Sequence, residues 1–309
     1  MSRMVGVSVA SAITESKGEQ NMASVAQAVD IERIGEDEFR GPVVPSLITR
    51  TFGGQTMAQA LRAAQLTVDE KLAHSMHCYF VGPGDSSAPT TIQVERIRDG
   101  RSFAHRHVRV FQDDRLIFML SAGFHATGDS GPEHQADMPQ VPPPESIKGS
   151  PYSTRIILKE WEDWDVRLVP DADRDAVAAE TTGAGFRNIW FRNTGDLAAA
   201  TSDQSLHQAA LLYMSDMTLI RTALLPHQGE RIQLASLDHS LWFLRPVRVD
   251  EWMLFSQSSP SAQSGTGLAQ GKIFNQRGEL LAVAMQEGLT RTLYPDSEAT
   301  SANGNWQNV

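Results

Sequence analysis

Apolar and polar residues follow two similar blocks along the chain, each with a helix-like run followed by four strand-like runs. The first block predicts a strand at 31–41, a helix at 53–67, and further strands at 74–83, 89–98, 102–112 and 115–125. The second predicts a strand at 187–193, a helix at 205–225, and strands near 233–246, 252–260, 264–276 and 279–292. This order favours an α+β fold in which each helix packs on a curled antiparallel sheet.

The two blocks are related by a constant shift of 163 residues over about seventy positions. Under this shift apolar and proline positions coincide, as in the pairs Phe80 with Phe243, Pro83 with Pro246, and Phe111 with Phe274. A single offset without gaps indicates that one structural unit has been duplicated within the chain.

The repeat and the composition of the remaining segments predict five regions. We expect a flexible N-terminal tail at 1–28, a first unit at 29–126, and a second unit carrying the candidate catalytic residues at 187–295. Residues 127–186 begin with a stretch rich in proline and acidic residues, which is typical of a connector over the surface. Residues 296–309 are expected to form a C-terminal tail.

Bulk composition narrows the function classes. The 309 residues carry a net charge of −10, which argues against nucleic-acid binding. No run approaches the roughly eighteen consecutive apolar residues of a membrane span. The single cysteine, Cys78, excludes an internal disulfide and a multi-thiolate metal site. We expect a cytoplasmic protein. We also expect no metal or cofactor, because metal-ligand spacing, phosphate loops and dinucleotide fingerprints are missing from the sequence.

Three polar residues occur in the second block only. Their aligned partners in the first block are small: Asp216 aligns with Gly53, Ser236 with Ala73, and Gln286 with Gly123. Each alone has an ordinary structural explanation, as a helix cap or first-turn acid, a residue opening a strand, or a strand-edge residue. Residues needed by the fold are expected in both copies. The asymmetry therefore favours a functional site, at a helix start and two adjoining strands, that holds one water.

The stretch "ASLDHSLWFLRPVR" also contains a serine, an aspartate and a histidine within four residues. Asp238 and His239 point to opposite faces if this stretch is one strand, so they cannot both join Ser236. The G-x-S-x-G turn of many serine hydrolases is also absent. We expect Asp238 and His239 to anchor the strand rather than to form a catalytic triad.

Seven segments then indicate a family. They are "RTFGGQTMAQAL", "HSMHCYFVGPGD", "RDGRSF", "LYMSDM", "LDHSLWFLRP", "DEWMLF" and "MQEGLTR". In this order and spacing, the chain resembles the bacterial acyl-CoA thioesterase II (TesB-type) family from about residue 31 to 292. The resemblance implies a double hotdog fold, in which two fused units each wrap an antiparallel sheet around a long helix.

The resemblance also implies roles for individual residues. Asp216, Ser236 and Gln286 match the family's catalytic aspartate, hydroxyl residue and glutamine, with serine in place of the more usual threonine. The substrate-binding glycine turn into the first helix matches three consecutive residues, Gly53, Gly54 and Gln55. Asp216 would activate a water that attacks the thioester. Direct attack by the carboxylate, through an anhydride, is the rival mechanism.

The implied partner is an acyl-CoA substrate, which places the protein in fatty acid and lipid metabolism, and the chain is expected to form a homodimer or homotetramer. Two other functions stay open. One is a catalytically weak acyl-CoA-binding or scaffold protein of the same fold. The other is a hotdog hydratase or dehydratase that uses an aspartate and histidine pair, for which His207 and Asp216 are the candidates, although "SLHQAALLYMSD" does not resemble that motif.

Overall fold

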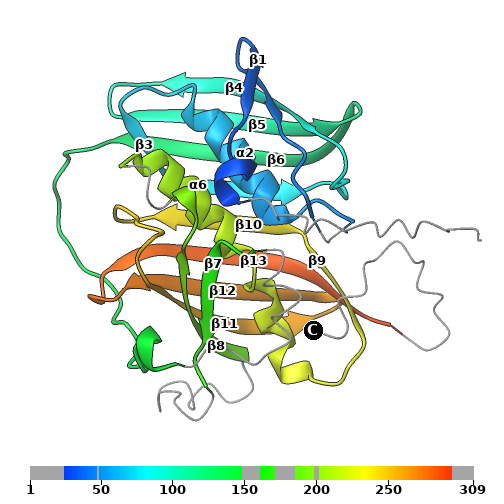
Figure 1. The fold of residues 1–309 in the computed structure, drawn as a ribbon, viewed down its shortest axis with the longest axis vertical. Helices are drawn as coiled ribbons and strands as arrows, with labels where there is room; N and C mark the ends of the chain where they lie inside the picture. The colour runs from blue at the N-terminus through cyan, green and yellow to red at the C-terminus, as the bar shows by residue number, and fades with distance from the viewer. Residues whose placement is uncertain (1–23, 47–48, 148–160, 171–184, 198–201, 294–309) are drawn as a thin grey trace, which may run out of the picture.

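The protein folds around one large antiparallel sheet that curls over its helices (Figure 1). The computed structural model describes residues 24–46, 49–147, 161–170, 185–197 and 202–293. The predicted C-terminal tail at 296–309 lies outside these residues. The α+β architecture predicted from the hydrophobic pattern is confirmed.

The first half of the chain contributes two helices, six strands and a short 3-10 turn within the described residues. Their bounds are α1 Val25–Ala28, β1 Glu32–Gly35, β2 Glu38–Gly41, α2 Gly53–Gln65, β3 Lys71–Phe80, β4 Thr90–Asp99, β5 Phe103–Gln112, β6 Arg115–Ala126 and η1 Pro144–Ser146. The second half contributes β7 Trp164–Leu168, β8 Gly185–Asn193, α6 Gln204–Ser215, η3 Ile220–His227, β9 Ile232–Ser236, β10 Asp238–Phe243, β11 Met253–Gln263, β12 Thr266–Asn275 and β13 Leu280–Thr292.

The strand order is symmetric about a central seam. It runs β1-β2-β4-β5-β6-β3-β10-β13-β12-β11-β8-β7, with β9 paired to β13 beside this path. Strands β4, β5 and β6 recur as β11, β12 and β13 at the 163-residue offset, and β5 and β12 coincide to the residue. The seam pairs β3 with β10, and His77 there faces Ser240 across the strands, with His77 Nδ1 3.1 Å from Ser240 Oγ. These two positions are themselves 163 residues apart, so the seam is a pseudo-two-fold axis.

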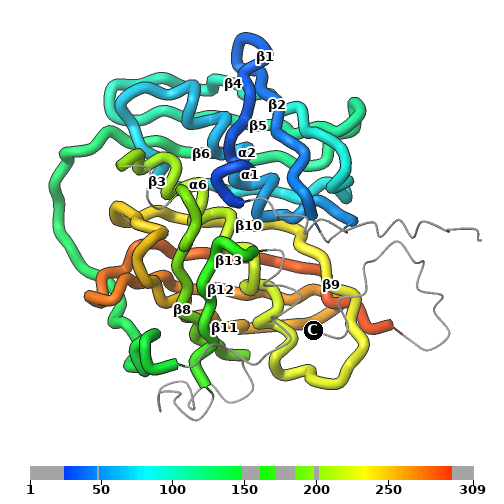
Figure 2. The backbone as a smooth tube through the Cα atoms, in the orientation of Figure 1, coloured from blue at the N-terminus to red at the C-terminus, as the bar shows by residue number. Residues whose placement is uncertain are grey.

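The helices lie against the concave side of the sheet. Helix α2 packs on β3, β4, β5 and β6, whereas η3 packs on β8, β11, β12 and β13. Helix α6 lies against α2, and β10 runs between the two halves (Figure 2). The larger apolar core is continuous across the seam and includes Met57 and Leu61 of α2 and Leu211 and Leu212 of α6. The two units are therefore one packed body at the place where the candidate residues lie.

The start of the chain and the connector differ from the prediction. Residues 31–41 form a hairpin rather than one strand, because Asp37 in the turn adopts a left-handed φ of 54°. The predicted tail at 1–28 ends in helix α1, which is capped by Ser24 and buries Val25 and Ala28, while residues 1–23 lie outside the description. The predicted connector contributes an edge strand, β7, and β8 begins at Gly185 rather than 187.

Two predicted elements of the second unit are each divided in the structure. The helical run at 205–225 ends at Ser215 and resumes as the 3-10 helix η3, so Asp216 is the C-cap of α6 rather than a helix start. The strand near 233–246 is broken at Leu237, whose N–H donates to Glu287 O and whose carbonyl accepts from Phe80 N–H. Ser236 therefore ends β9 instead of opening a strand, and β10 is free to pair with β3.

Candidate active site

Asp216 belongs to the second unit, but its carboxylate lies at the N-terminus of helix α2 in the first unit. Its side chain is largely buried, with the residue 8% exposed, and it accepts a hydrogen bond from the backbone N–H of Gly54. A Cβ atom placed on Gly53 would lie only 2.6 Å from Asp216 Oδ2 and 2.9 Å from the Phe80 ring. Only glycine leaves room for the carboxylate at this position. The positive end of the α2 dipole faces the same group.

Gln286 joins Asp216 to Ser236. Its Nε2 lies 2.6 Å from Asp216 Oδ1 and 3.0 Å from Ser236 Oγ, and the glutamine is fully buried in β13. The register explains the meeting: Ser236 pairs with Gly288, and Gln286 lies two residues before Gly288 on the same face of β13. The adjoining strands predicted for Ser236 and Gln286 are therefore confirmed, and the three polar residues of the second unit converge.

Burial dominates the electrostatics of this cluster. It raises the pKa of Asp216 from 3.8 to about 6, because a low-dielectric environment disfavours the charged form. Hydrogen bonds from Gln286, the Gly54 N–H and Ser236 act in the opposite direction and favour the carboxylate. The group is thus ionised at neutral pH but considerably more basic than an exposed aspartate, which suits a proton acceptor.

Two further polar residues lie behind the cluster, and their connection to it was not predicted from the sequence. His239 Nε2 lies 3.0 Å from Ser215 Oγ, and both residues are fully buried. Burial lowers the pKa of His239 to about 3, while the Gln286 side chain raises it, so the imidazole is neutral. A signal was present in the repeat: the counterparts of Ser215 and His239 are Phe52 and Met76, both apolar.

The Ser-His-Asp triad and the hydratase pair are not assembled. Asp238 Oδ1 accepts the backbone N–H of Glu287, as expected of a strand anchor, and His239 contacts Ser215 rather than Ser236. His207 is buried in α6, where its Nδ1 accepts the N–H of Val249. None of these groups supplies a base for a serine nucleophile or an acid for dehydration.

The three residues expected from the glycine turn separate into two groups. Gly53 and Gly54 border the Asp216 carboxylate, as described above. Gln55 lies in the first turn of α2, where its N–H donates to Phe52 O. Within the described part of the chain, no hydrogen bond links the Gln55 side chain to the cluster.

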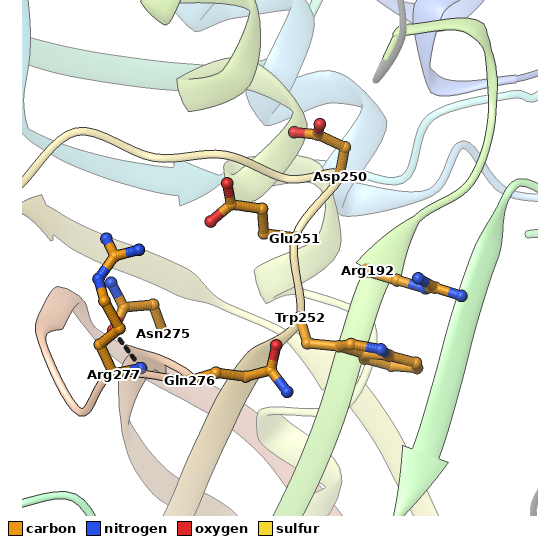
Figure 3. Close-up of a pocket in the computed structure, with 7 residues that line it drawn as sticks. All are labelled: Arg192, Asp250, Glu251, Trp252, Asn275, Gln276 and Arg277. Carbon is orange, nitrogen blue, oxygen red and sulfur yellow. Dashed lines mark hydrogen bonds between the residues drawn. The ribbon is translucent and has the colours of Figure 1, made fainter. Parts of the chain in front are cut away.

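A separate surface pocket of about 370 Å³ lies at the β8 side of the second unit (Figure 3). The Arg192 guanidinium stacks over the Trp252 ring at 4.6 Å, and Asp250, Glu251 and Arg277 line the same recess. None of the residues of the polar cluster lines this pocket. Its charges are mixed and its arginines pair with neighbouring groups, so the buried cluster is the better candidate for chemistry.

The side-chain clusters and helix lengths also bear on metal and membrane binding. Among the described residues, no group of three or more histidine, cysteine, aspartate or glutamate side chains is arranged to hold a metal ion. No helix in that part of the chain has the length and apolar character needed to cross a bilayer.

Two family models match the chain. Residues 44–125 match the family model described as the acyl-CoA thioesterase N-terminal domain, and residues 165–289 match the model described as acyl-CoA thioesterase. The human acyl-coenzyme A thioesterase 8 is 34% identical over 91% of this chain and 93% of its own length. Acyl-CoA thioesterase 2 of Haemophilus influenzae is 34% identical, over 84% of this chain and 94% of its own.

The chain belongs to the acyl-CoA thioesterase family. Within it, the crystal structure of TesB2, an acyl-CoA thioesterase II from Mycobacterium marinum, has a TM-score of 0.77 with this thioesterase-family chain. The two are 41% identical, over 87% of this chain and 99% of TesB2. A protein with a hot dog fold from Alicyclobacillus acidocaldarius, 21% identical, has a TM-score of 0.72 over 87% of this chain and 98% of its own. The TesB-type resemblance and the double hotdog fold predicted from the sequence are confirmed.

The raised pKa of Asp216 predicts a pH-dependent cost to stability. The folded state binds the Asp216 proton more tightly than the unfolded state, so the stabilising contribution is complete below about pH 4 and is lost as pH rises through about 6. A shift of this size corresponds to about 3 kcal/mol. Relative to the wild type, Asp216→Asn is therefore expected to gain about 3 kcal/mol in unfolding free energy between pH 4 and pH 8.

Urea denaturation across this pH range measures the effect. Asp69→Asn, which changes an exposed carboxyl, is the matched control and is expected to show no such trend. A wild-type-to-variant difference that stays constant from pH 4 to pH 8 would show that Asp216 is not an ionised buried group.

Proposed function

We propose that this protein hydrolyses acyl-CoA thioesters to a free carboxylic acid and CoA. The observation that carries the proposal is the convergence of Asp216, Ser236 and Gln286 around one buried carboxylate with a pKa near 6. The names of the human and Haemophilus influenzae relatives, which are acyl-CoA thioesterases, support the substrate class.

In the proposed reaction, water attacks the thioester directly. The Asp216 carboxylate removes a proton from the water as its oxygen bonds to the carbonyl carbon. The resulting tetrahedral intermediate collapses with cleavage of the C–S bond, and the CoA thiolate leaves. The proton held by Asp216 passes to the thiolate or to solvent, which restores the carboxylate. A thiolate is a stable leaving group, so the site needs no strong general acid.

Ser236 and Gln286 position the participants of this step. The Ser236 hydroxyl can bond the attacking water, and the Gln286 amide fixes the Asp216 carboxylate through Oδ1. The Gly54 N–H holds the Asp216 carboxylate, and the neighbouring N–H of Gly53 at the N-terminus of α2 would stabilise negative charge on the carbonyl oxygen. We include Gln55 in the substrate-binding turn because it lies in the same helical turn.

Several expectations from the sequence stay predictions. They are the division into units at 29–126 and 187–295, the cytoplasmic location, and assembly as a homodimer or homotetramer. The acyl-chain length that the protein prefers is measured by the same thiol-release assay as its activity.

Asp216→Asn is expected to lower kcat for acyl-CoA hydrolysis by about 10²–10⁴-fold, because the amide cannot accept the water proton. A thiol-release assay with short, medium and long acyl-CoAs measures the effect, and binding of the same acyl-CoAs by calorimetry shows whether the variant still takes up substrate.

Asp238→Asn provides a matched control, because Asp238 is a nearby carboxyl that, among the described residues, accepts only the Glu287 N–H. This variant is expected to keep wild-type kcat. Near-wild-type hydrolysis by Asp216→Asn would remove Asp216 from the mechanism. Tight acyl-CoA binding without turnover by the wild type would instead support the scaffold alternative.

The pH profile of kcat provides a further prediction. Activity should rise with pH through an apparent pKa of about 6 and level off above it, because Asp216 must be deprotonated to accept the proton. Initial rates in buffers of constant ionic strength from pH 4.5 to 8.5 record the profile, with circular dichroism to confirm the folded state at each pH. An acidic limb near pH 4 would contradict the buried-base assignment.

A further inference from the structure

Two buried polar atoms next to the proposed site lack a hydrogen-bond partner at normal distance among the described residues. They are the carboxamide oxygen Oε1 of Gln286 and the ring nitrogen Nδ1 of His239. A buried polar atom that is left without a partner destabilises the folded state. The register that pairs Ser240 of β10 with Met285 of β13 places His239 beside Gln286, so the unpartnered acceptor and the potential donor have a common explanation.

The contacts of the Gln286 NH₂ group determine the orientation of its amide. Its NH₂ group faces Asp216 Oδ1 at 2.6 Å and Ser236 Oγ at 3.0 Å. An ionised carboxylate only accepts hydrogen bonds, so a flipped amide would bring two acceptor oxygens together. The Gln286 oxygen must therefore point away from Asp216 and needs a donor there.

His239 is placed to supply that donor. Its Nε2 lies 3.0 Å from Ser215 Oγ, which leaves Nδ1 on the opposite side of the ring. The Gln286 side chain acts on His239 as an acceptor, since it raises the pKa of a histidine that burial holds neutral. Cys78, which pairs with His239 across the seam, is also neutral because burial raises the pKa of its thiol. A neutral imidazole carries one N–H, so its tautomer decides whether Gln286 is held.

The repeat supports a functional rather than a structural role for this pair. At the equivalent positions of the first unit, the chain has the partly buried Phe52 in place of Ser215 and the fully buried Met76 in place of His239. The fold thus accepts apolar residues at both positions. Ser215 and His239 occur only in the unit that also carries Asp216, Ser236 and Gln286.

We propose that His239 is a positioning residue for the reaction: its Nδ1–H donates to Gln286 Oε1, and the Ser215 hydroxyl, donating to Nε2, selects this tautomer. The role rests on the proposed thioesterase function. The Ser215 hydroxyl has one hydrogen and also lies 2.8 Å from Leu212 O, so donation to Nε2 replaces that bond. His239 transfers no proton in this scheme; it locks the amide that orients Asp216 and Ser236.

Two substitutions separate the ring nitrogens. The side-chain amide of asparagine reaches the place of Nδ1, whereas that of glutamine reaches the place of Nε2. His239→Asn keeps a donor for Gln286 and is expected to retain most of kcat. His239→Gln loses that donor, and kcat should fall by about 10²-fold with KM little changed, as expected for a misplaced catalytic group.

A double variant tests whether the effect passes through Gln286. In a Gln286→Ala background, His239→Gln is expected to lower kcat little further, because the amide that His239 holds is gone. Equal losses from the asparagine and glutamine variants, a change in KM or melting temperature alone, or the same loss in both backgrounds would overturn the proposal. His239→Met, which copies Met76 of the other unit, shows whether a folded protein is obtained without either nitrogen.

Nitrogen NMR of the histidine ring provides a readout that does not depend on turnover. The proposal predicts a neutral Nδ1–H tautomer of His239 that does not titrate between about pH 5 and 8, with an Nδ1 shift that changes in Gln286→Ala. An Nε2–H tautomer would overturn it. If the wild type hydrolyses no acyl-CoA but the Nδ1–H tautomer is found, the thioesterase function fails while the hydrogen bond stands.

Discussion

The burial of one carboxylate, Asp216, at the seam between the two units is the constraint on which the site depends. Removing this group from water makes it more basic, and the fold keeps it ionisable by surrounding it with donors from three places: the N-terminus of α2, strand β13 and the end of β9. Each donor lies on a different element. The proposed chemistry therefore requires both units to be packed as one body, because neither unit alone contains all of the candidate site.

The pseudo-two-fold symmetry explains why the site occurs once. Gly53 and Asp216 are equivalent positions of the two units, and they meet near the axis, where the carboxylate fills the space that a Gly53 side chain would need. An acid at both positions would place two like charges together in the interior. Duplication within one chain allows one copy to supply the acid and the other to supply the helix N-terminus beside it.

The sequence predicted the duplicated α+β architecture and the three residues that converge, because the periodicity and the constant offset between the two blocks can both be read directly from the sequence. It did not predict the break at Leu237. If the stretch is treated as one strand, alternation places Ser236 and His239 on opposite faces. The break lets Ser236 in β9 and His239 in β10 approach Gln286 from different strands. Likewise, the sequence placed Asp216 at a helix start, whereas it is the C-cap of α6.

In the proposed mechanism, Asp216 activates water rather than attacking the thioester itself. Single-turnover hydrolysis in water enriched in ¹⁸O, with enzyme in excess over acyl-CoA, tests it directly. Direct attack by water predicts one ¹⁸O atom in the free acid and none in the peptide containing Asp216, as measured by mass spectrometry. Label in the Asp216 carboxyl after one turnover would show an anhydride intermediate and contradict direct attack by water.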